Sequence, residues 1–149
     1  MILRVVTPLA VVVDTRDVVY VRAEDESGAF GILAGHAGLL TSLSTSVVTW
    51  RERADGERYV AVRGGVLEVR ADEVLISTRE AVTGSDLQQL QSEVVARFQR
   101  DLAAEQAARA DAQRLYLAAL RQIVRYLRPG GRQTLREAQL GDLGTAVDQ

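Results

Sequence analysis

The sequence of 149 residues contains no cysteine, no lysine and a single histidine, His36. Without cysteine, the protein can form neither a disulfide nor a thiolate metal site, and one histidine is too few for structural zinc. Without lysine, the Gly-Lys-Ser/Thr ending of a phosphate-binding P-loop is absent too. The acidic clusters lie in expected turns and lack the alternating spacing of a calcium loop. We therefore expect no metal and no bound cofactor.

Long apolar runs and a strong net charge are also missing. No run approaches the roughly 20 apolar residues of a membrane-spanning helix. A net charge of −2 gives no whole-chain attraction to nucleic acid or to an anionic membrane. Arg4 followed by an apolar run weakly resembles a secretion signal, but Pro8 and the charges from Asp14 onward favour a first strand. We expect a soluble protein that reaches a membrane only through partners.

The first half of the chain consists of short β-rich runs separated by turn residues. Runs spaced by roughly 8–12 residues are typical of an antiparallel β-sandwich or barrel, and no intervening helix suggests a parallel sheet. Asp55-Gly56 predicts a hairpin, because both residues tolerate positive φ. The expected strands are 3–6, 10–14, 18–23, 29–33, 47–51, 58–63, 66–70 and 74–78.

The second half changes to a helical period. Ser85 or Asp86 can cap a helix, and neither glycine nor proline occurs from Leu87 to Leu127. We favour an antiparallel hairpin of two helices over one long helix, because a hairpin buries both apolar stripes. The expected domains are a β-sandwich at 1–84, a helical domain at 85–129 and a tail at 130–149. The two stripes are Leu87, Leu90, Val94, Phe98 and Leu102, and Tyr116, Leu120, Ile123 and Leu127.

Arginine gathers on the side of the second helix opposite its apolar stripe. Four residues form this arginine stripe, and no acidic residue occurs between Asp111 and Glu137 to balance them. Two interpretations stay open. The stripe is either a solvated face or, as a basic amphipathic helix, a surface that meets an acidic partner, a membrane or nucleic acid. Its members are Arg114, Arg121, Arg125 and Arg128.

A glycine-rich corner lies at 28–43 and contains His36. Glycine at this density indicates sharp turns or close approach to another surface, and the flanking apolar residues indicate that the segment is docked. His36 lacks an activated hydroxyl or an acid beside it, so we expect a turn histidine that hydrogen-bonds backbone and no catalytic residue. A shaped corner of this kind predicts contact with a partner.

Several of these runs together resemble the epsilon subunit of F-type ATP synthases. They cover most of residues 2–81 in the right order, while the helical part matches in kind more than in sequence. Its ending at 120–129 (LRQIVRYLRP) is similar to the alternate ATPase (N-ATPase) branch. The matching runs are 6–9 (VTPL), 28–33 (GAFGIL), 35–37 (GHA), 39–41 (LLT) and 59–70 (YVAVRGGVLEVR).

The resemblance implies a ten-stranded sandwich in a non-catalytic rotor subunit, which binds the gamma subunit and rests on the membrane c-ring. It also implies that the C-terminal helices can extend along gamma to the catalytic head and restrain ATP hydrolysis, and that the subunit lies at the cytoplasmic face of the bacterial inner membrane. We add the hypothesis that the arginine stripe then meets acidic surface on the head. The implied partner interface is Gly28, Ala29, Phe30, Gly31, Ile32, Gly35, His36 and Leu39.

The sequence departs from the family pattern in two places. Ala34 and Gly38 replace the usual prolines of Pro-Gly-His-Ala-Pro, which indicates a looser corner. The ATP motif Leu/Ile-Asp-x-x-Arg-Ala is replaced at 87–92 by LQQLQS, so we expect no ATP binding. An alternative function is an independent adaptor whose basic helix grips RNA or an acidic protein. The sheet region, however, lacks the interleaved aromatics and arginines that stack bases.

Overall fold

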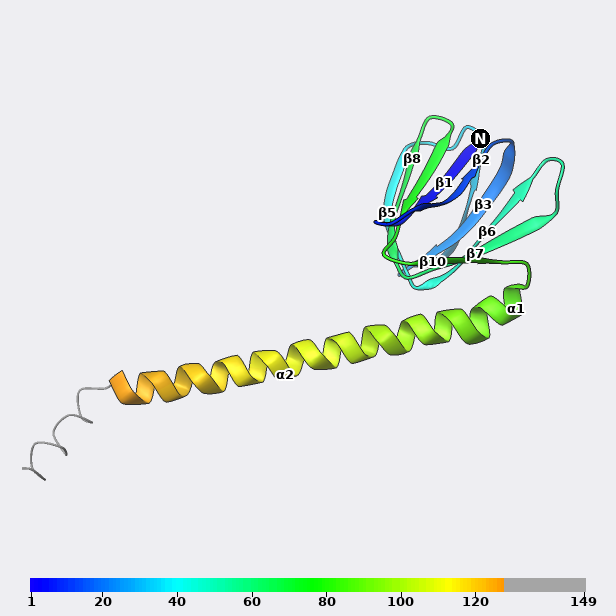
Figure 1. Cartoon of the computed structure of the whole chain (residues 1–149). Helices are drawn as coiled ribbons and strands as arrows, with labels where there is room; N and C mark the ends of the chain where they lie inside the picture. The colour runs from blue at the N-terminus through cyan, green and yellow to red at the C-terminus, as the bar shows by residue number, and fades with distance from the viewer. Residues whose placement is uncertain (128–149) are drawn as a thin grey trace, which may run out of the picture. The chain divides into compact units, whose positions relative to one another are not determined.

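The computed structural model describes residues 1–127, so Arg128 and the predicted tail at 130–149 lie outside it. Ten strands form the sandwich predicted for the first part of the chain (Figure 1). They are β1 (Ile2–Val6), β2 (Val11–Thr15), β3 (Val18–Asp25), β4 (Gly28–Leu33), β5 (Leu39–Leu43), β6 (Ser46–Glu52), β7 (Glu57–Val62), β8 (Gly65–Arg70), β9 (Glu73–Ser77) and β10 (Ala81–Gly84).

The strands follow the order β10-β7-β6-β3-β5-β8-β9-β1-β2, and β4 lies off this path as a second neighbour of β3. Within residues 1–127, all strand pairings are antiparallel except one: β1 runs parallel to β9, from Ile2 opposite Glu73 to Val6 opposite Ser77. The sheet is therefore antiparallel as predicted, apart from this one parallel pair, which the sequence did not indicate. The strands between β1 and β9 make the connection that a crossover helix makes in an α/β protein.

Alternating apolar residues fill the sandwich. On β8, Leu67 and Val69 are buried while Glu68 and Arg70 face outward, as a sheet with one dry face requires. Trp50 contributes the largest side chain of this core and is 4% exposed. The fully buried members at the centre are Leu3, Val5, Val21, Ile32, Val48, Val60, Val62, Leu67, Val74 and Ile76.

Two strands, β5 and β10, were not predicted individually. β5 reads Leu-Leu-Thr-Ser-Leu, which lacks the β-branched alternation of the other runs, and β10 is only four residues long. Both owe their conformation to a paired neighbour, since β5 aligns with β8 and β10 aligns with β7. Pairing across the sheet thus overrides weak local preference.

Some turn glycines adopt positive φ and others do not. The predicted hairpin joins β6 to β7, but neither Asp55 nor Gly56 has positive φ, so the predicted reason was wrong. The loop of residues 53–56 is longer than the two-residue turn that needs this conformation. Gly64 and Gly65 do have positive φ, at 60° and 128°.

One continuous helical run follows the sandwich, and the favoured hairpin is not what the structure contains. α1 (Leu87–Gln89) leads through the π-helical segment η1 (Leu90–Val95) into α2 (Ala96–Leu127). Asp86 is the N-cap, and its carboxylate accepts the backbone N–H groups of Gln88 and Gln89 at 2.8 and 3.2 Å. With no glycine or proline to reverse the chain, the alanine-rich middle stays helical.

The first apolar stripe is shifted from its predicted set. Leu90, Val95 and Phe98 are buried against Ala61, whereas Leu87 and Leu102 are 39% and 38% exposed. The cause is η1, because a π-helix bonds residue i to i+5 and so brings Leu90 and Val95 onto one face. The helix start therefore packs on the outer face of the sheet at β6, β7 and β10, partly covering Val47, Tyr59 and Val82.

The chain divides into two compact units, Met1–Ala103 and a second that begins at Ala104. The second apolar stripe, expected to be buried, is exposed over its whole length, with Tyr116 at 65% and Leu127 at 76%. The described part of this unit is a single helix, which has no second element to cover its stripe. The domain boundary predicted at residue 85 stays a prediction.

Among the described helices, none combines the length and the apolar character needed to cross a membrane.

Candidate partner-binding site

The predicted corner comprises β4, the connection at 34–38 and β5. Two glycines shape it, since Gly28 and Gly35 have φ values of +122° and +80°, which L side chains rarely adopt. The connection is closed by the backbone N–H of His36, which donates to the carbonyl of Leu33 at 3.1 Å. All the implied interface residues lie between Gly28 and Leu39, in one continuous segment of the first unit.

The strands divide the implied interface residues between two faces. Ile32 is fully buried in the sandwich core, and Phe30 and Leu39 pack against that core. Ala29 and Gly31 alternate with them and are exposed. The inward side chains therefore anchor the corner in the sandwich, and the outward positions are exposed.

Asp25 ties the turn before β4 to β5. Its Oδ1 accepts the backbone N–H of Ser27 at 2.8 Å and the Ser27 hydroxyl at 2.6 Å, while its Oδ2 accepts the Thr41 hydroxyl at 3.0 Å. Hydrogen bonds from Ser27, and then from Thr41, hold the pKa of Asp25 below its usual value of 3.8. The carboxylate is therefore charged, and bonded, at neutral pH.

This arrangement predicts how the corner responds to acid. Because the bonds favour the charged form, their contribution to folding is complete above the usual carboxyl pKa and is lost as pH falls through the lowered one. An NMR titration of the Asp25 carboxyl carbon should give a midpoint below 3.8, and Thr41→Val should move it upward. A parental midpoint at or above 3.8 would contradict this account.

His36 hydrogen-bonds backbone, as predicted, since its Nδ1 lies 2.7 Å from the carbonyl oxygen of Ala37. The ring itself is exposed and not packed into the turn, which the sequence did not anticipate. Within residues 1–127, no acidic or hydroxyl side chain forms a hydrogen bond with the His36 ring. We assign it no catalytic role.

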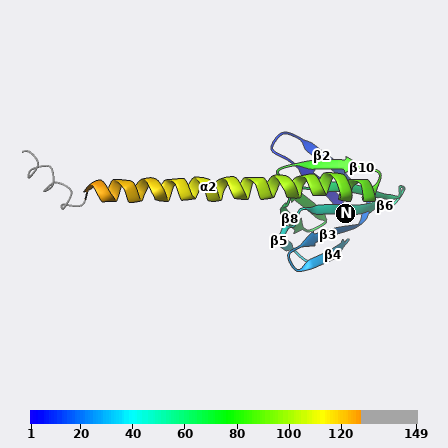
Figure 2. The same cartoon turned by 90° about the horizontal axis from the view of Figure 1, so that it is seen from below.

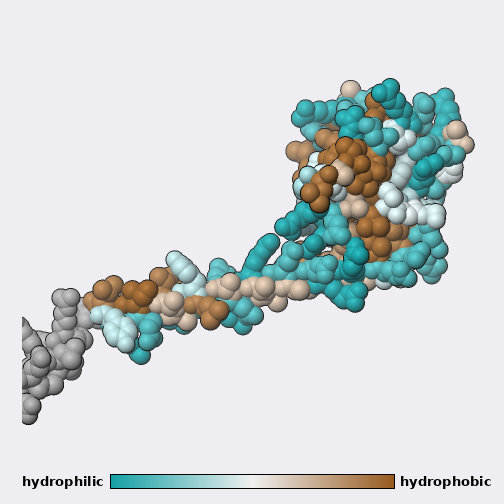
Figure 3. Space-filling model, viewed as in Figure 1, coloured by the Kyte–Doolittle hydropathy of each residue, from teal (hydrophilic) through white to brown (hydrophobic). Residues whose placement is uncertain are grey.

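Sequence reasoning missed the exposed apolar residues of the corner. Leu33 is 63% exposed and Leu40 is 70% exposed, and Val66 on β8, opposite Ser42 of β5, is 45% exposed. Figure 3 shows apolar side chains reaching the surface of the sandwich. The period of two on β4 could have found Leu33, because it follows the buried Ile32 directly.

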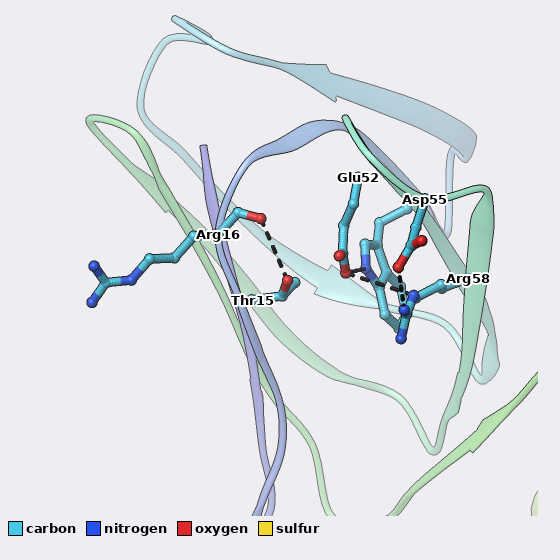
Figure 4. A network of polar contacts seen from close by, with 6 residues as sticks. Thr15, Arg16, Glu52, Asp55 and Arg58 are labelled. Carbon is cyan, nitrogen blue, oxygen red and sulfur yellow. Dashed lines mark hydrogen bonds and ion pairs between the residues drawn. The ribbon is translucent and has the colours of Figure 1, made fainter.

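A second region with polar chemistry is a pocket of about 660 Å³ between β2, β6, β7 and β10. In Figure 4, Glu52 and Asp55 both meet the guanidinium of Arg58, at 3.8 and 2.5 Å, and Thr15 bonds the carbonyl of Arg16. The Glu52 carboxylate also accepts the indole N–H of Trp50 at 3.1 Å. These carboxylates are engaged in ion pairs and hydrogen bonds and stand beside no nucleophile-and-base pair.

Residues 1–127 likewise contain no group of three metal-ligating side chains.

The arginine stripe lies on α2. Arg114 forms an exposed ion pair with Asp111, three residues earlier, at 3.7 Å, so one member of the stripe has an acidic neighbour. Arg121 and Arg125 are exposed and form no ion pair within the part of the chain that the structure describes. Arg128 lies beyond the described residues.

Comparison with known proteins identifies the family to which this sequence is similar. The family described as ATP synthase, Delta/Epsilon chain, beta-sandwich domain matches residues 1–84. The chain is 40% identical to ATP synthase epsilon chain 2 of Paraburkholderia xenovorans over 128 residues, 85% of this chain and 92% of the relative. It is 38% identical to ATP synthase epsilon chain 2 of Cereibacter sphaeroides over 126 residues, 84% and 86% of the two chains.

Among solved structures, a chain of the Euglena gracilis mitochondrial ATP synthase (OSCP/F1/c-ring, rotational state 1) shares the fold, with a TM-score of 0.54 and 22% identity. The match covers 60% of this chain and 58% of that one. The chain belongs to the ATP synthase delta/epsilon family, as a non-catalytic epsilon-type subunit.

Proposed function

We propose that this subunit joins the gamma subunit to the membrane ring of c subunits and passes torque between them. The observation that carries the proposal is the 40% identity with an ATP synthase epsilon chain across 92% of that relative. A β-sandwich with a continuous, densely packed apolar core is stiff, and stiffness suits a rotor subunit that must transmit force without deforming. On this proposal the subunit lies at the cytoplasmic face of the bacterial inner membrane.

The corner is the proposed contact for gamma and the c-ring. Ala29 and Gly31 would contact partners directly, together with the exposed Leu33 and Leu40, which offer apolar area beside backbone that glycine leaves accessible. The remaining members of the implied set support the corner through packing or turn geometry. They are Gly28, Phe30, Ile32, Gly35, His36 and Leu39.

Copurification tests this function against its alternatives. The tagged chain, expressed in its host, should bring down the gamma subunit in a nuclease-resistant complex. Capture of RNA, lost on nuclease treatment, would instead support the adaptor alternative with its basic helix. Recovery of the chain without gamma would refute the rotor proposal.

Gly31→Val provides a sharper test of the corner. A Cβ at Gly31 would meet no heavy atom within 4 Å, so the free energy of unfolding should change by less than about 1 kcal/mol. The added side chain should obstruct close approach of a partner and weaken gamma binding about tenfold. Thermal melting and a binding titration measure the two effects. Loss of stability with unchanged binding would contradict the assignment.

The helical part, which we propose begins at residue 85, would act as a brake on ATP hydrolysis. Here Arg121 and Arg125, with Arg128 beyond the described residues, would meet acidic surface on the catalytic head. Their exposure and the absence of ion pairs at Arg121 and Arg125 within residues 1–127 support this proposal. The narrower resemblance to the N-ATPase branch also stays a prediction.

The brake predicts a specific kinetic result. Changing Arg121 and Arg125 to glutamine should alter stability by less than about 0.5 kcal/mol each, since both are exposed. It should raise ATP hydrolysis by the assembled enzyme, as deletion of everything after Ser85 should. Arg100→Gln, an exposed arginine on the first part of α2, is the control. If the deletion accelerates ATP hydrolysis and the double variant does not, the arginine stripe is only a solvated face of the helix.

A further inference from the structure

β4 forms an unpaired margin of the sheet. Within residues 1–127 it pairs with β3 and with no other strand. Figure 2 shows it at the outer margin of the sandwich, beside β3. One edge of β4 therefore carries backbone groups that the sheet does not use.

The hydrogen bonds of β3 identify these groups. The carbonyl of Glu24 accepts the backbone N–H of Ser44 at 3.0 Å, so the backbone groups of Glu24 point away from β4. In an antiparallel ladder this direction alternates, and Arg22 therefore points the same way as Glu24. Their partners on β4 are Ala29, opposite Glu24, and Gly31, opposite Arg22. The N–H and C=O groups of Ala29 and Gly31 consequently face out from the sheet.

Nothing on β4 blocks this edge. Proteins commonly protect free edges with charged residues, proline or a bulge. The sequence of β4, Gly-Ala-Phe-Gly-Ile-Leu, contains neither a charge nor a proline. Its register with β3 is uninterrupted from Tyr20 opposite Leu33 to Asp25 opposite Gly28, so there is no bulge either. The edge is open to pairing with another strand.

Gly31 has no internal reason to be glycine. Its φ lies outside the positive region, and a Cβ there would meet no atom within 4 Å. Glycine inside a strand weakens it and often marks close approach of another backbone. Beside Gly31 lies a hollow of about 430 Å³, bordered by Tyr20, Arg22 and Leu33. Arg22 is exposed and forms no ion pair with any described residue.

We infer that the free edge of β4 binds an extended strand of the gamma subunit by backbone hydrogen bonds to Ala29 and Gly31, with an acidic side chain of that strand seated beside Arg22. The inference rests on the proposed function, because it takes gamma as the partner. It adds the mode of recognition, which is strand addition to a sheet edge. An edge without charged side chains suits a partner that binds through its own backbone. Because the guanidinium of Arg22 has no ion-pair partner within residues 1–127, the side chain that enters the hollow should be acidic.

Hydrogen exchange tests the backbone contact directly. In the free chain, the outward amides of Ala29 and Gly31 should exchange quickly, whereas the inward amides of Phe30 and Ile32 should be protected by β3. In the complex with gamma, the amides of Ala29 and Gly31 should slow at least about tenfold, as new hydrogen bonds require. A complex that forms and leaves these two amides unprotected would overturn the inference.

Two pairs of variants test the backbone hydrogen bonds and the charge of Arg22 separately. Ala29→Pro removes an outward N–H, which an edge strand tolerates, and should weaken gamma binding about tenfold more than Ala29→Val, which adds a side chain of similar size but keeps the N–H. Arg22→Gln should weaken binding and reduce its salt dependence. Arg16→Gln, at an exposed arginine that does not line the hollow, should do neither. Melting temperatures near the parental value confirm that all four variants fold.

The outcomes distinguish this inference from the function on which it rests. A parental chain that does not bind gamma refutes the proposed function and the inference with it. A parental complex in which Ala29→Pro and Ala29→Val bind equally refutes the inference alone. Protection of Ala29 and Gly31 in the isolated chain, with a dimer mass by sedimentation, would make a second copy the occupant and overturn the assignment to gamma.

Discussion

Gly65→Ala is expected to unfold most of the sandwich at temperatures where the parent is stable. A Cβ at this position would lie 2.2 Å from the carbonyl oxygen of Ser77 and 3.0 Å from the Cα of Thr78, and φ is +128°. Both clashing atoms belong to backbone, so no side-chain rotation relieves the contact. Overpacking costs about 1–3 kcal/mol and a strained backbone conformation about as much again, which predicts a loss of about 3 kcal/mol or more.

Urea denaturation followed by Trp50 fluorescence measures this loss. Gly31→Ala is the matched control, because the same change there meets open space in a strand with ordinary φ. Its free energy of unfolding should stay within about 1 kcal/mol of the parent, or rise as the unfolded chain loses freedom. Equal effects of the two substitutions would show that the close approach of β8 to the end of β9 does not exclude a side chain.

Phe98→Ala should release the start of the helical run from the sheet while the sandwich stays folded. Phe98 is fully buried in a cluster with Ala61, Leu90 and Val95, which is separate from the core between the sheets. Removing a buried phenylalanine side chain typically costs about 3–5 kcal/mol, through lost burial and the cavity that remains. One further contact, the ion pair between Arg97 and Glu80 at 3.0 Å, is exposed and contributes little.

Amide hydrogen exchange distinguishes local from global effects. Protection should fall along η1 and the first turns of α2, whereas amides of β1 and β8 should keep parental protection. Leu102→Ala is the control, since Leu102 is 38% exposed and truncation there should cost less than about 1 kcal/mol. Loss of protection across the whole sandwich would show instead that the two clusters fold as one cooperative unit.

Three conclusions came from the sequence because they depend on local chemistry. Alternating residues such as Leu67 and Val69 predicted strands, and the carboxylate of Asp86 capped the helix because its position before Leu87 allowed it to reach two free amides. The missing cysteines and lysines excluded whole classes of site. The runs matching the epsilon family then predicted the sandwich and the family, and both were confirmed.

Other features were decided by tertiary structure. β5 and β10 became strands only because β8 and β7 pair with them, and β1 runs parallel to β9 because the chain between them closes the sandwich. The buried helical stripe moved to Val95 when η1 changed the phase of the helix, a change that no 3.6-residue period anticipates. The free edge of β4 is likewise invisible in sequence, since an edge is defined by the strand that is absent beside it. Local chemistry determined which elements form, and pairing between distant strands decided which of their surfaces remain open.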